Sequence, residues 1–513
     1  MVATAYMVSR LTNFMRNPFA HQEDAPLAAI TITVMLGLIM AIIDSTIVNV
    51  ALNTIGGNLG ASVDEVSWVA TGYILANVCV MPLNGWLTAF LGRKRFYAAS
   101  LALFTIASLL CGTATSITQL VIYRVIQGIG GGALQPTAQS ILFESYPPER
   151  RGTAMAIFGV GAMVGPAVGP TLGGYIVDNA SWPLIFYINI PIGIVAFLMT
   201  MAYIPNPKFI KKPESGIDWT GLTLLTAGLA SLQYVLERGE HDEWYSSQTI
   251  TVLTVVAAVT LVWFVLKMLR ERQPLVELQV FRLRSFAIGN IIGIITGFGL
   301  FGTALILPLL FQTIFNFTAF DTGMALLPGA ATTAVSMFFV GRLLHYIDAR
   351  WSIAFGMFIF ALSCWQLGGL STDAGYWDVF WPRFIQGFGL GFIFVPLSTV
   401  TLSEVPMAEL AGATGVYTLV RQIGGSFGIA ILTTLLTHQT AVAWNVLASG
   451  ITQTHGMPVG ALTQMVAQQA SMIAYNYLLQ ITAIVFVVAM PLVFFIRVKK
   501  RDQEGLPVAA MAE

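Results

Sequence analysis

The residue in this sequence that is best suited to chemistry inside a membrane is Asp44. It is a carboxylate deep within an apolar stretch, residues 42–52. An ionised Asp at the centre of a bilayer costs about 2.5–3.5 kcal/mol, so this side chain must face a cavity, a partner or a proton. Apolar surroundings favour the neutral carboxyl, as a proton-binding site requires. We therefore expect a role in proton coupling; the alternative is a structural Asp that pins a neighbouring helix.

Three arginines also lie within apolar stretches, where a guanidinium keeps its charge and needs a counter-charge or a polar cage. Arg124 lies three residues before Gln127, so both side chains share one helix face. We expect Arg124 to be a charged partner of Asp44 in a proton relay; the alternative is that it extends to the outer membrane interface. Arg383 is closer to the start of its stretch, which leaves function and interface anchoring equally open. Arg421 could meet an anionic substrate group, line a gate or form a structural ion pair.

A stripe of glycines recurs at every fourth position between residues 159 and 174 and alternates with two prolines. Such a stripe lets another helix approach closely, and proline removes backbone donors and bends a helix. We expect a kinked, closely packed helix that can rock; the alternative is plain helix packing. Its residues are Gly161, Gly165, Pro166, Gly169, Pro170, Gly173 and Gly174.

A second glycine motif contains the cations Arg93, Lys94 and Arg95. Gly85 and Gly92 flank the motif and allow a tight turn between two helices. The cations could bind helix ends or acidic side chains. The alternative, simple anchoring by positive charge, explains the cations but not the glycines.

The composition places these motifs in a membrane. Only 10% of the 513 residues are charged and 56% are hydrophobic, with a mean hydropathy of +0.76, whereas a typical soluble chain is about a quarter charged. This composition excludes a disordered chain and a secreted disulfide scaffold, and a net charge of zero argues against nucleic-acid binding. No zinc, nucleotide-binding or serine-nucleophile motif has the required context, so neither an enzyme nor a cofactor or metal site is expected.

Fourteen apolar stretches are each long enough to cross roughly 30 Å of hydrocarbon and are predicted as membrane helices. With the amino terminus inside, 21 of the 25 Lys and Arg residues fall in cytoplasmic segments and only Arg238 falls outside. This positive-inside pattern predicts a multi-pass protein with both termini in the cytoplasm. The predicted spans are 27–52, 68–90, 96–115, 117–143, 153–177, 184–203, 220–236, 249–269, 285–315, 322–344, 351–370, 379–402, 411–438 and 475–495.

The chain repeats itself, because the pattern R-x-I-Q-G-x-G-x-G occurs at Arg124–Gly132 and again at Arg383–Gly391. Two parallel six-helix halves around a central cavity are typical of transporters. The predicted parts are a cytoplasmic segment 1–26, an N-terminal six-helix bundle 27–204, a linker with two additional helices 205–284, a C-terminal six-helix bundle 285–496 and a cytoplasmic tail 497–513.

Residues 440–476 form the longest predicted external connection and contain no charged residue. Polar and apolar residues alternate along it in a helix-like way, although a floppy loop is the alternative. A connection of this length is often functional, and we expect it to contact a periplasmic partner.

Together these motifs resemble the major facilitator superfamily and, more closely, its fourteen-helix drug:proton antiporter family of EmrB-type multidrug efflux pumps. Residues 44–52, 85–95, 124–128 and 161–174 carry the resemblance. It implies an all-α integral membrane protein with the major facilitator fold, two six-helix bundles plus two inserted central helices. Two positions depart from the family pattern. Asn53 stands where Pro is common, and Ala89 stands where the loop motif usually has Asp, which puts the charge latch of that loop in doubt.

The resemblance also implies proton-driven efflux of hydrophobic or amphipathic drugs across a bacterial inner membrane. The partners it implies are an EmrA-type periplasmic adaptor and a TolC-like outer-membrane channel. We expect alternating access, in which a proton that binds Asp44 favours outward release. One alternative is a proton-linked exporter of a specific metabolite, such as a fatty acid or siderophore; another is a non-transporting receptor or scaffold. The candidate cavity residues are Asn49, Gln127, Gln135, Asn290, Gln312, Tyr417 and Arg421.

Overall fold

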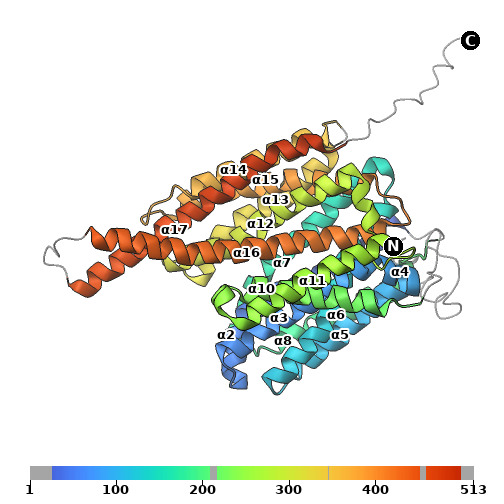
Figure 1. The fold of residues 1–513 in the computed structure, drawn as a ribbon, viewed down its shortest axis with the longest axis horizontal. Helices are drawn as coiled ribbons and strands as arrows, with labels where there is room; N and C mark the ends of the chain where they lie inside the picture. Colours follow the sequence, from blue (N-terminus) through green and yellow to red (C-terminus); the bar gives the residue numbers. More distant parts are fainter. Residues whose placement is uncertain (1–25, 208–215, 345, 451–457, 498–513) are drawn as a thin grey trace, which may run out of the picture.

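The computed structural model describes residues 26–207, 216–344, 346–450 and 458–497. These residues form an all-helical bundle, and none of them lies in a β-strand (Figure 1). The predicted N-terminal segment up to residue 25, the cations at 208–212 and the tail from residue 498 lie outside the described residues.

The N-terminal half contains six membrane-length units. The second unit changes from α-helix to a 3-10 turn at Met81–Leu83 before it continues, and the sixth begins with a separate helical turn. The elements are α2 (Leu27–Leu59), α3 (Val63–Val80), η1 (Met81–Leu83), α4 (Asn84–Leu91), α5 (Arg93–Gly112), α6 (Ile117–Ser145), η2 (Pro148–Arg150), α7 (Arg151–Asn179), α8 (Leu184–Tyr187) and α9 (Asn189–Tyr203).

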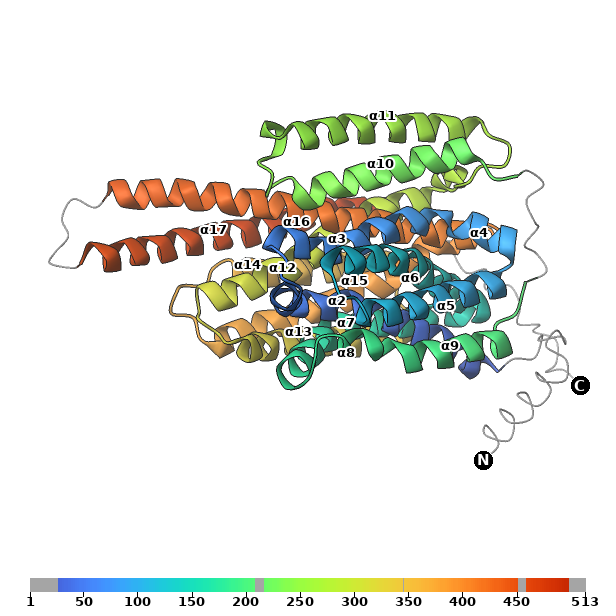
Figure 2. The same ribbon diagram turned by 90° about the horizontal axis from the view of Figure 1, so that it is seen from below.

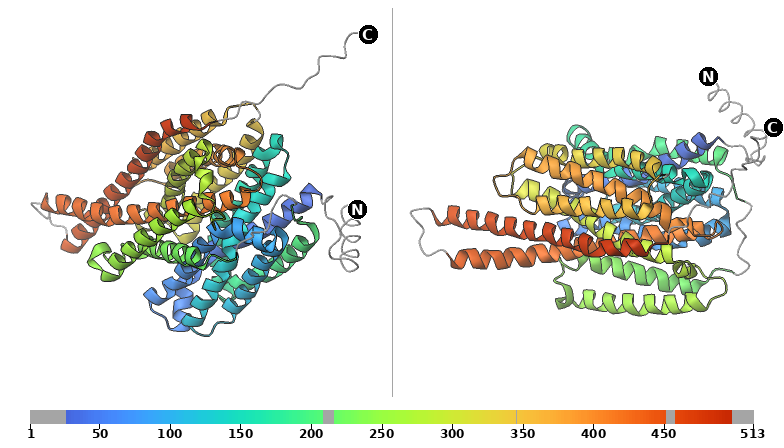
Figure 3. Two further views of the ribbon diagram at one scale, coloured as in Figure 1. Left: turned by 45° about the vertical axis from the view of Figure 1, so that its right-hand side comes forward. Right: turned by 90° about the horizontal axis from the view of Figure 1, so that it is seen from above.

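Two inserted helices and six further helices complete the bundle. Figure 2 shows the inserted pair α10 and α11 side by side at one edge, and Figure 3 shows the two halves of the chain lying next to each other. The elements are α10 (Trp219–Arg238), η3 (Trp244–Ser246), α11 (Gln248–Arg270), η4 (Leu278–Arg282), α12 (Arg284–Thr313), α13 (Ala319–Leu343), α14 (Ala349–Leu367), α15 (Tyr376–Ser403), α16 (Leu410–Ser449), α17 (Val459–Ala489) and η5 (Met490–Phe495).

The two halves use the same helix pairs. In the first half α2 packs on α7, α3 on α6, and α5 on both α6 and α9; in the second half α12 packs on α16, α13 on α15, and α14 on both α15 and α17. Small residues allow this close packing in both halves. A Cβ on Gly165 would lie 2.1 Å from Ile42 of α2, and one on Gly424 would lie 2.5 Å from Ile294 of α12. The sequence repeat therefore corresponds to a repeat of the packing.

Ten of the described helices are long and apolar enough to cross a membrane by length and composition. The four other predicted spans correspond to α6, α7, α10 and α14, which pack among these ten. Polar residues and glycines lower the hydropathy of such helices, and α6 contains the arginine motif. Neighbouring helices satisfy these residues, so a helix inside the bundle does not need the apolarity of one that faces lipid.

Helices α16 and α17 extend much further than the sequence indicates. The predicted spans were 411–438 and 475–495, whereas α16 has 40 residues and α17 has 31. At 1.5 Å per residue, α16 is about 60 Å long, roughly twice the thickness of the hydrocarbon core. The pair forms a hairpin that projects beyond the rest of the bundle (Figures 1 and 2). Within the expected connection 440–476, residues 440–449 and 459–476 are thus helical, and residues 451–457 lie outside the described residues.

We call the end with Arg93 and Lys94 the basic end and the opposite end, where α16 and α17 project, the hairpin end. At the basic end the two halves touch closely. The side-chain nitrogen of Asn84 donates to the Ala411 carbonyl at 2.8 Å, and a Cβ on Gly85 would lie 2.6 Å from the Cα of Gly412. Gly85 therefore allows two helices to touch, whereas the sequence had suggested that it allows a turn.

The contact between Gly85 and Gly412 is asymmetric, which provides a matched test. A Cβ on Gly85 overlaps the backbone of Gly412, but a Cβ on Gly412 has its nearest neighbour at 3.7 Å. Gly85→Ala should push α4 away from α16 and destabilise this closed arrangement by about 1–3 kcal/mol, the usual cost of overpacking. Gly412→Ala should change little. Thermal unfolding of the two purified variants in detergent measures the difference; equal melting temperatures would contradict this packing.

Candidate functional site

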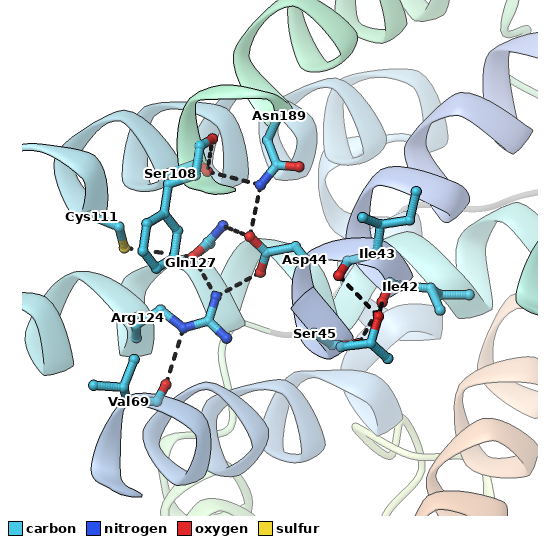
Figure 4. A network of polar contacts seen from close by, with 12 residues as sticks. Ile42, Ile43, Asp44, Ser45, Val69, Ser108, Cys111, Arg124, Gln127 and Asn189 are labelled. Atoms are coloured by element: carbon cyan, nitrogen blue, oxygen red, sulfur yellow. Dashed lines mark hydrogen bonds and ion pairs between the residues drawn. The ribbon is translucent and has the colours of Figure 1, made fainter. Parts of the chain in front are cut away.

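Asp44 lies in the middle of α2 and is completely buried, with an exposed fraction of 0%. Three side chains donate hydrogen bonds to its carboxylate (Figure 4). Oδ2 accepts from Nη1 of Arg124 at 2.6 Å. Oδ1 accepts from Nε2 of Gln127 at 2.9 Å and from Nδ2 of Asn189 at 2.7 Å. Helices α2, α6 and α9 therefore meet at a single carboxylate.

Arg124 is as deeply buried as its partner, with an exposed fraction of 1%. Its Nε donates to the Val69 carbonyl at 3.0 Å, and Nη1 also donates to Oε1 of Gln127 at 2.8 Å. The guanidinium lies over the ring of Tyr73, 4.2 Å from its centroid. This is the polar cage that a charged arginine needs inside a membrane, so the alternative in which Arg124 extends to the interface does not apply to this arrangement.

Asn189 is a member of this network that sequence reasoning did not select as a site residue. Its Nδ2 donates both to Asp44 and to Oγ of Ser108, which in turn donates to the Phe186 carbonyl. The sequence offered one signal, a buried amide between apolar residues at the start of α9. An amide in this position is costly unless it is hydrogen-bonded, but the chain does not reveal that its partner would be Asp44.

The network surrounds Asp44 with donors and offers its carboxylate a cation. Oδ1 accepts from Gln127 and Asn189, whereas Oδ2 accepts from Arg124. Oε1 of Gln127 in turn accepts from Arg124 and from Cys111 at 3.6 Å. Binding of a proton to Asp44 would remove the negative charge that compensates Arg124, so it would weaken the ion pair.

The glycine stripe of α7 packs on the helix that carries Asp44. A Cβ on Gly165 would overlap Ile42, and one on Gly169 would lie 2.1 Å from Oγ1 of Thr46. Thr46 also donates to the Gly165 carbonyl at 3.0 Å. The stripe therefore contacts α2 on both sides of Asp44 in sequence. Gly161 and Gly173 make similar close approaches to α2, Gly174 has open space around it, and the side chains of Pro166 and Pro170 lie outside the described residues.

The second half repeats the arginine motif without a carboxylate. Arg383 donates to Gln386 three residues later, as Arg124 does to Gln127. Gln386 contacts the sulfur of Cys364 at 3.5 Å, matching the contact of Gln127 with a cysteine. Among the residues that the structure describes, no ion pair joins Arg383 to an acid. The buried ion pair therefore belongs to the N-terminal half alone.

Arg421 forms a second polar group near the boundary between the halves. It has an exposed fraction of 6% and lies over the rings of Phe394 and Tyr417, 4.9 Å and 5.7 Å from their centroids. Phe394 also stacks on Phe158 of the other half, at 6.3 Å between centroids. Nη1 of Arg421 has no hydrogen-bond partner, and no carboxylate within the described ranges pairs with this arginine. Two aromatic rings, and no acid of the described residues, therefore surround this cation.

The remaining predicted cavity residues do not gather around either group. Asn290 is buried and donates to the Phe286 carbonyl at 2.8 Å, and Gln135 is half-buried. Asn49 and Gln312 are exposed. Of the seven candidates, the structure joins Gln127 to Asp44 and Tyr417 to Arg421. It leaves the other four apart from both groups: Asn49, Gln135, Asn290 and Gln312.

Comparison with known proteins agrees with this architecture. A family model described as the Major Facilitator Superfamily matches residues 34–429. The Multidrug export protein EmrB of Escherichia coli (strain K12) is 35% identical over 491 residues, covering 92% of this chain and 96% of the relative. The Fatty acid resistance protein FarB of Neisseria gonorrhoeae is 33% identical over 491 residues, covering 92% of this chain and 96% of the relative. The chain belongs to the EmrB/FarB-type multidrug exporters of the Major Facilitator Superfamily.

Solved structures confirm the major facilitator fold. The crystal structure of the human organic anion transporter MFSD10 superimposes with a TM-score of 0.61 at 13% identity, covering 90% of this chain and 99% of that one. At this level of identity the similarity concerns the fold alone. The superfamily consists of transporters, so the predictions of a multi-pass membrane protein and of a non-enzyme are confirmed.

In the loop motif of this exporter Ala89 replaces the usual Asp, but another acid forms an ion pair with the motif. Gly92 adopts a φ of 82°, a left-handed conformation that favours glycine, and ends α4. Arg93 then pairs with Glu144 at the end of α6. The backbone nitrogen of Lys94 donates to Oδ1 of Asn206 at 3.0 Å. The charge latch therefore lies within the N-terminal half; the other departure, Asn53, is an exposed residue of α2.

A double-mutant cycle tests the pair of Asp44 and Arg124. Arg124→Gln leaves a buried carboxylate without its cation, which should destabilise the protein by about 3–5 kcal/mol. Adding Asp44→Asn to this variant removes the orphaned charge and should recover much of the loss. Thermal unfolding of the purified single and double variants measures both steps. Strictly additive losses would show that the two side chains do not act as a pair.

Proposed function

We propose that the chain is a proton-driven antiporter that exports hydrophobic or amphipathic drugs across the bacterial inner membrane. The observation that carries this proposal is the buried pair of Asp44 and Arg124, fully removed from water inside an exporter-family fold. A buried ion pair is weak evidence for stability, because well-packed apolar residues would often serve equally well. Ionisable residues inside a membrane are instead functional by default.

The pair supplies a means of coupling. When Asp44 is ionised, it binds α6 through Arg124 and Gln127 and α9 through Asn189. A proton that arrives from outside removes the charge that attracts Arg124 and thereby loosens α2 from α6. Because α7 packs on α2 through its glycines, the change reaches the helix that touches the other half. One charge moved across the membrane supplies about 2.3 kcal/mol per 100 mV.

A specific observation favours a second candidate function, the export of an anionic metabolite such as a fatty acid. FarB is named for fatty acid resistance, and Arg421 is a buried cation without an acidic partner in the described residues. An anionic head group would supply the missing counter-charge, and Phe394 and Tyr417 would contact its apolar part. The siderophore alternative and the receptor or scaffold alternative have no comparable observation in their favour.

The hairpin of α16 and α17 supports the proposed tripartite assembly with an EmrA-type periplasmic adaptor and a TolC-like outer-membrane channel. Near its base the two helices flank an open groove of about 440 Å³, lined in part by Leu436, Trp444 and Tyr475. The hairpin contains 40-residue and 31-residue helices, which exceed the length needed to cross the membrane. With the basic end in the cytoplasm, as the positive-inside rule requires, the hairpin extends into the periplasm and both termini face the cytoplasm.

Asp44→Asn should abolish proton-coupled export. The amide cannot bind or release a proton at this position, so drug should still bind but should no longer exchange against a pH gradient. Proteoliposomes that contain a pH-sensitive dye and are supplied with ethidium measure both fluxes. Asn58→Asp, which adds an exposed acid near the end of the same helix, is the control. Undiminished exchange by Asp44→Asn would refute the coupling role.

Shortening the hairpin should separate adaptor binding from transport. A variant in which a short Gly-Ser linker replaces residues 442–470 should lose co-purification with an EmrA-type adaptor, because it removes the projecting surface. The same variant should still exchange ethidium for protons in proteoliposomes, because Asp44 and its partners lie elsewhere. Adaptor binding at the wild-type level would remove the hairpin from the proposed interface.

A further inference from the structure

Glu237 is a second carboxylate inside the bundle, and the predicted span 220–236 ended one residue before it. It lies in the last turn of α10 and is half-buried. Its Oε2 accepts from Oγ1 of Thr71 at 3.1 Å, and its Oε1 accepts from Nε2 of Gln233 at 3.1 Å. Both partners are neutral. We propose that Glu237 is a second proton-binding site of the transporter, additional to Asp44 and resting on the proposed proton-coupled function.

The charged groups on the elements around Glu237 are bound to other partners. On α10 itself Arg238 donates to Ser67 and pairs with Asp64 of α3 at 3.6 Å. On α16 Arg421 lies over two aromatic rings. On α11 Lys267 pairs with Asp218, at the opposite end of the α10–α11 pair from Glu237. The other nearby ionisable groups also have partners: Glu65 caps α3 through Ser62, Glu240 accepts from Trp244, and His241 contacts Asp64 and Asp242.

The two intramembrane carboxylates therefore have opposite surroundings. Asp44 touches a guanidinium that compensates its negative charge. Glu237 has no cation in contact with it among the described residues, and an ionised carboxylate that leaves water without a cation becomes neutral instead. Asp44 thus has a compensating cation in contact with it, whereas Glu237 accepts from neutral donors.

The neighbouring amide can accommodate the added proton. Nε2 of Gln233 donates twice, to Glu237 and to Oγ of Ser426 at 2.8 Å, while its Oε1 is buried without any partner. An unsatisfied buried acceptor costs about 1–3 kcal/mol. A protonated Glu237 gains a hydroxyl that can donate to this oxygen after the amide rotates. The network can therefore exist with the proton or without it.

The position of Glu237 connects this proton to movement of the two halves. The chain of hydrogen bonds runs from Thr71 on α3, through Glu237 and Gln233 on α10, to Ser426 on α16. These helices belong to the N-terminal half, the inserted pair and the C-terminal half. When α16 moves relative to α3, the partners of Glu237 must change, and with them its affinity for a proton. The inserted helices thereby gain a role in coupling.

A proton is a better occupant than an organic cation. Both carboxylate oxygens are already covered by side chains from α3 and α10, and Ser426 lies next to the same amide. A proton binds after no more than a rotation of the Gln233 amide. A drug cation would have to separate α10 from α3 to reach the carboxylate.

Infrared difference spectroscopy of the full chain in lipid tests the assignment, because a protonated carboxyl has its own C=O band. The wild-type protein should show such a band that disappears as the pH is raised. Glu237→Gln should lack it, whereas Glu243→Gln, which removes an exposed acid from the following turn, should retain it. Thr71→Val removes a donor to the ionised form and should extend the band to higher pH. An unchanged spectrum in Glu237→Gln would overturn the proposal.

Ethidium exchange in dye-filled proteoliposomes separates this site from the proposed function. If the wild-type protein moves no protons with ethidium, the antiport proposal fails whatever the spectra show. If the wild type exchanges protons, Glu237→Gln should move fewer protons per ethidium while Glu243→Gln moves the wild-type number. A different outcome would overturn the assignment. If Glu237→Gln keeps the carboxyl band of the wild type but no longer binds ethidium, Glu237 binds the drug cation and not a proton.

Discussion

The buried pair of Asp44 and Arg124 is the constraint on which the arrangement of the N-terminal half depends. Each of these buried charges is costly alone and is compensated by the other, which holds α2 and α6 together at this depth. The remaining donors and acceptors then determine the neighbours. Asn189 places α9 against the same carboxylate, and the Val69 carbonyl places α3 against the guanidinium. Four helices are thereby oriented around two charges.

The sequence could predict the helices because they depend on local composition. It could also single out Asp44 and Arg124, because a charged residue within an apolar stretch needs a partner. Apolar stretches predict spans, and the three-residue spacing of Arg124 and Gln127 predicts a shared face. The contact of Asn189 with Asp44 and the residue at which α10 ends could not be predicted in this way. Whether an amide in one helix meets a carboxylate in another depends on packing between distant segments. The full length of α16 could not be predicted either. Its outer part continues the apolar span without a residue that marks where the helix leaves the membrane.

Duplication has preserved the scaffold of the polar site but not its chemistry. Both halves contain an arginine, a glutamine three residues later and a cysteine that contacts that glutamine. Only the first half supplies an acid. In the second half, Arg421 is the deeply buried cation, and it contacts aromatic rings beside the other half. One half therefore contains a compensated charge suited to a proton, and the other contains an uncompensated charge suited to an anion.

The described partners of Asp44 all belong to the N-terminal half. A change in the protonation of Asp44 can therefore affect the C-terminal half only through other helices. Two routes lead across the boundary. Helix α7 packs on α2 through its glycines and also on α13, where a Cβ on Gly152 would lie 2.9 Å from the Gly341 carbonyl. Helix α10 forms the other route through Glu237 and Gln233. The first route lies at the basic end and the second towards the hairpin end. In the alternating access that we propose, contacts open at one end while they close at the other, and these two routes lie towards opposite ends of the bundle.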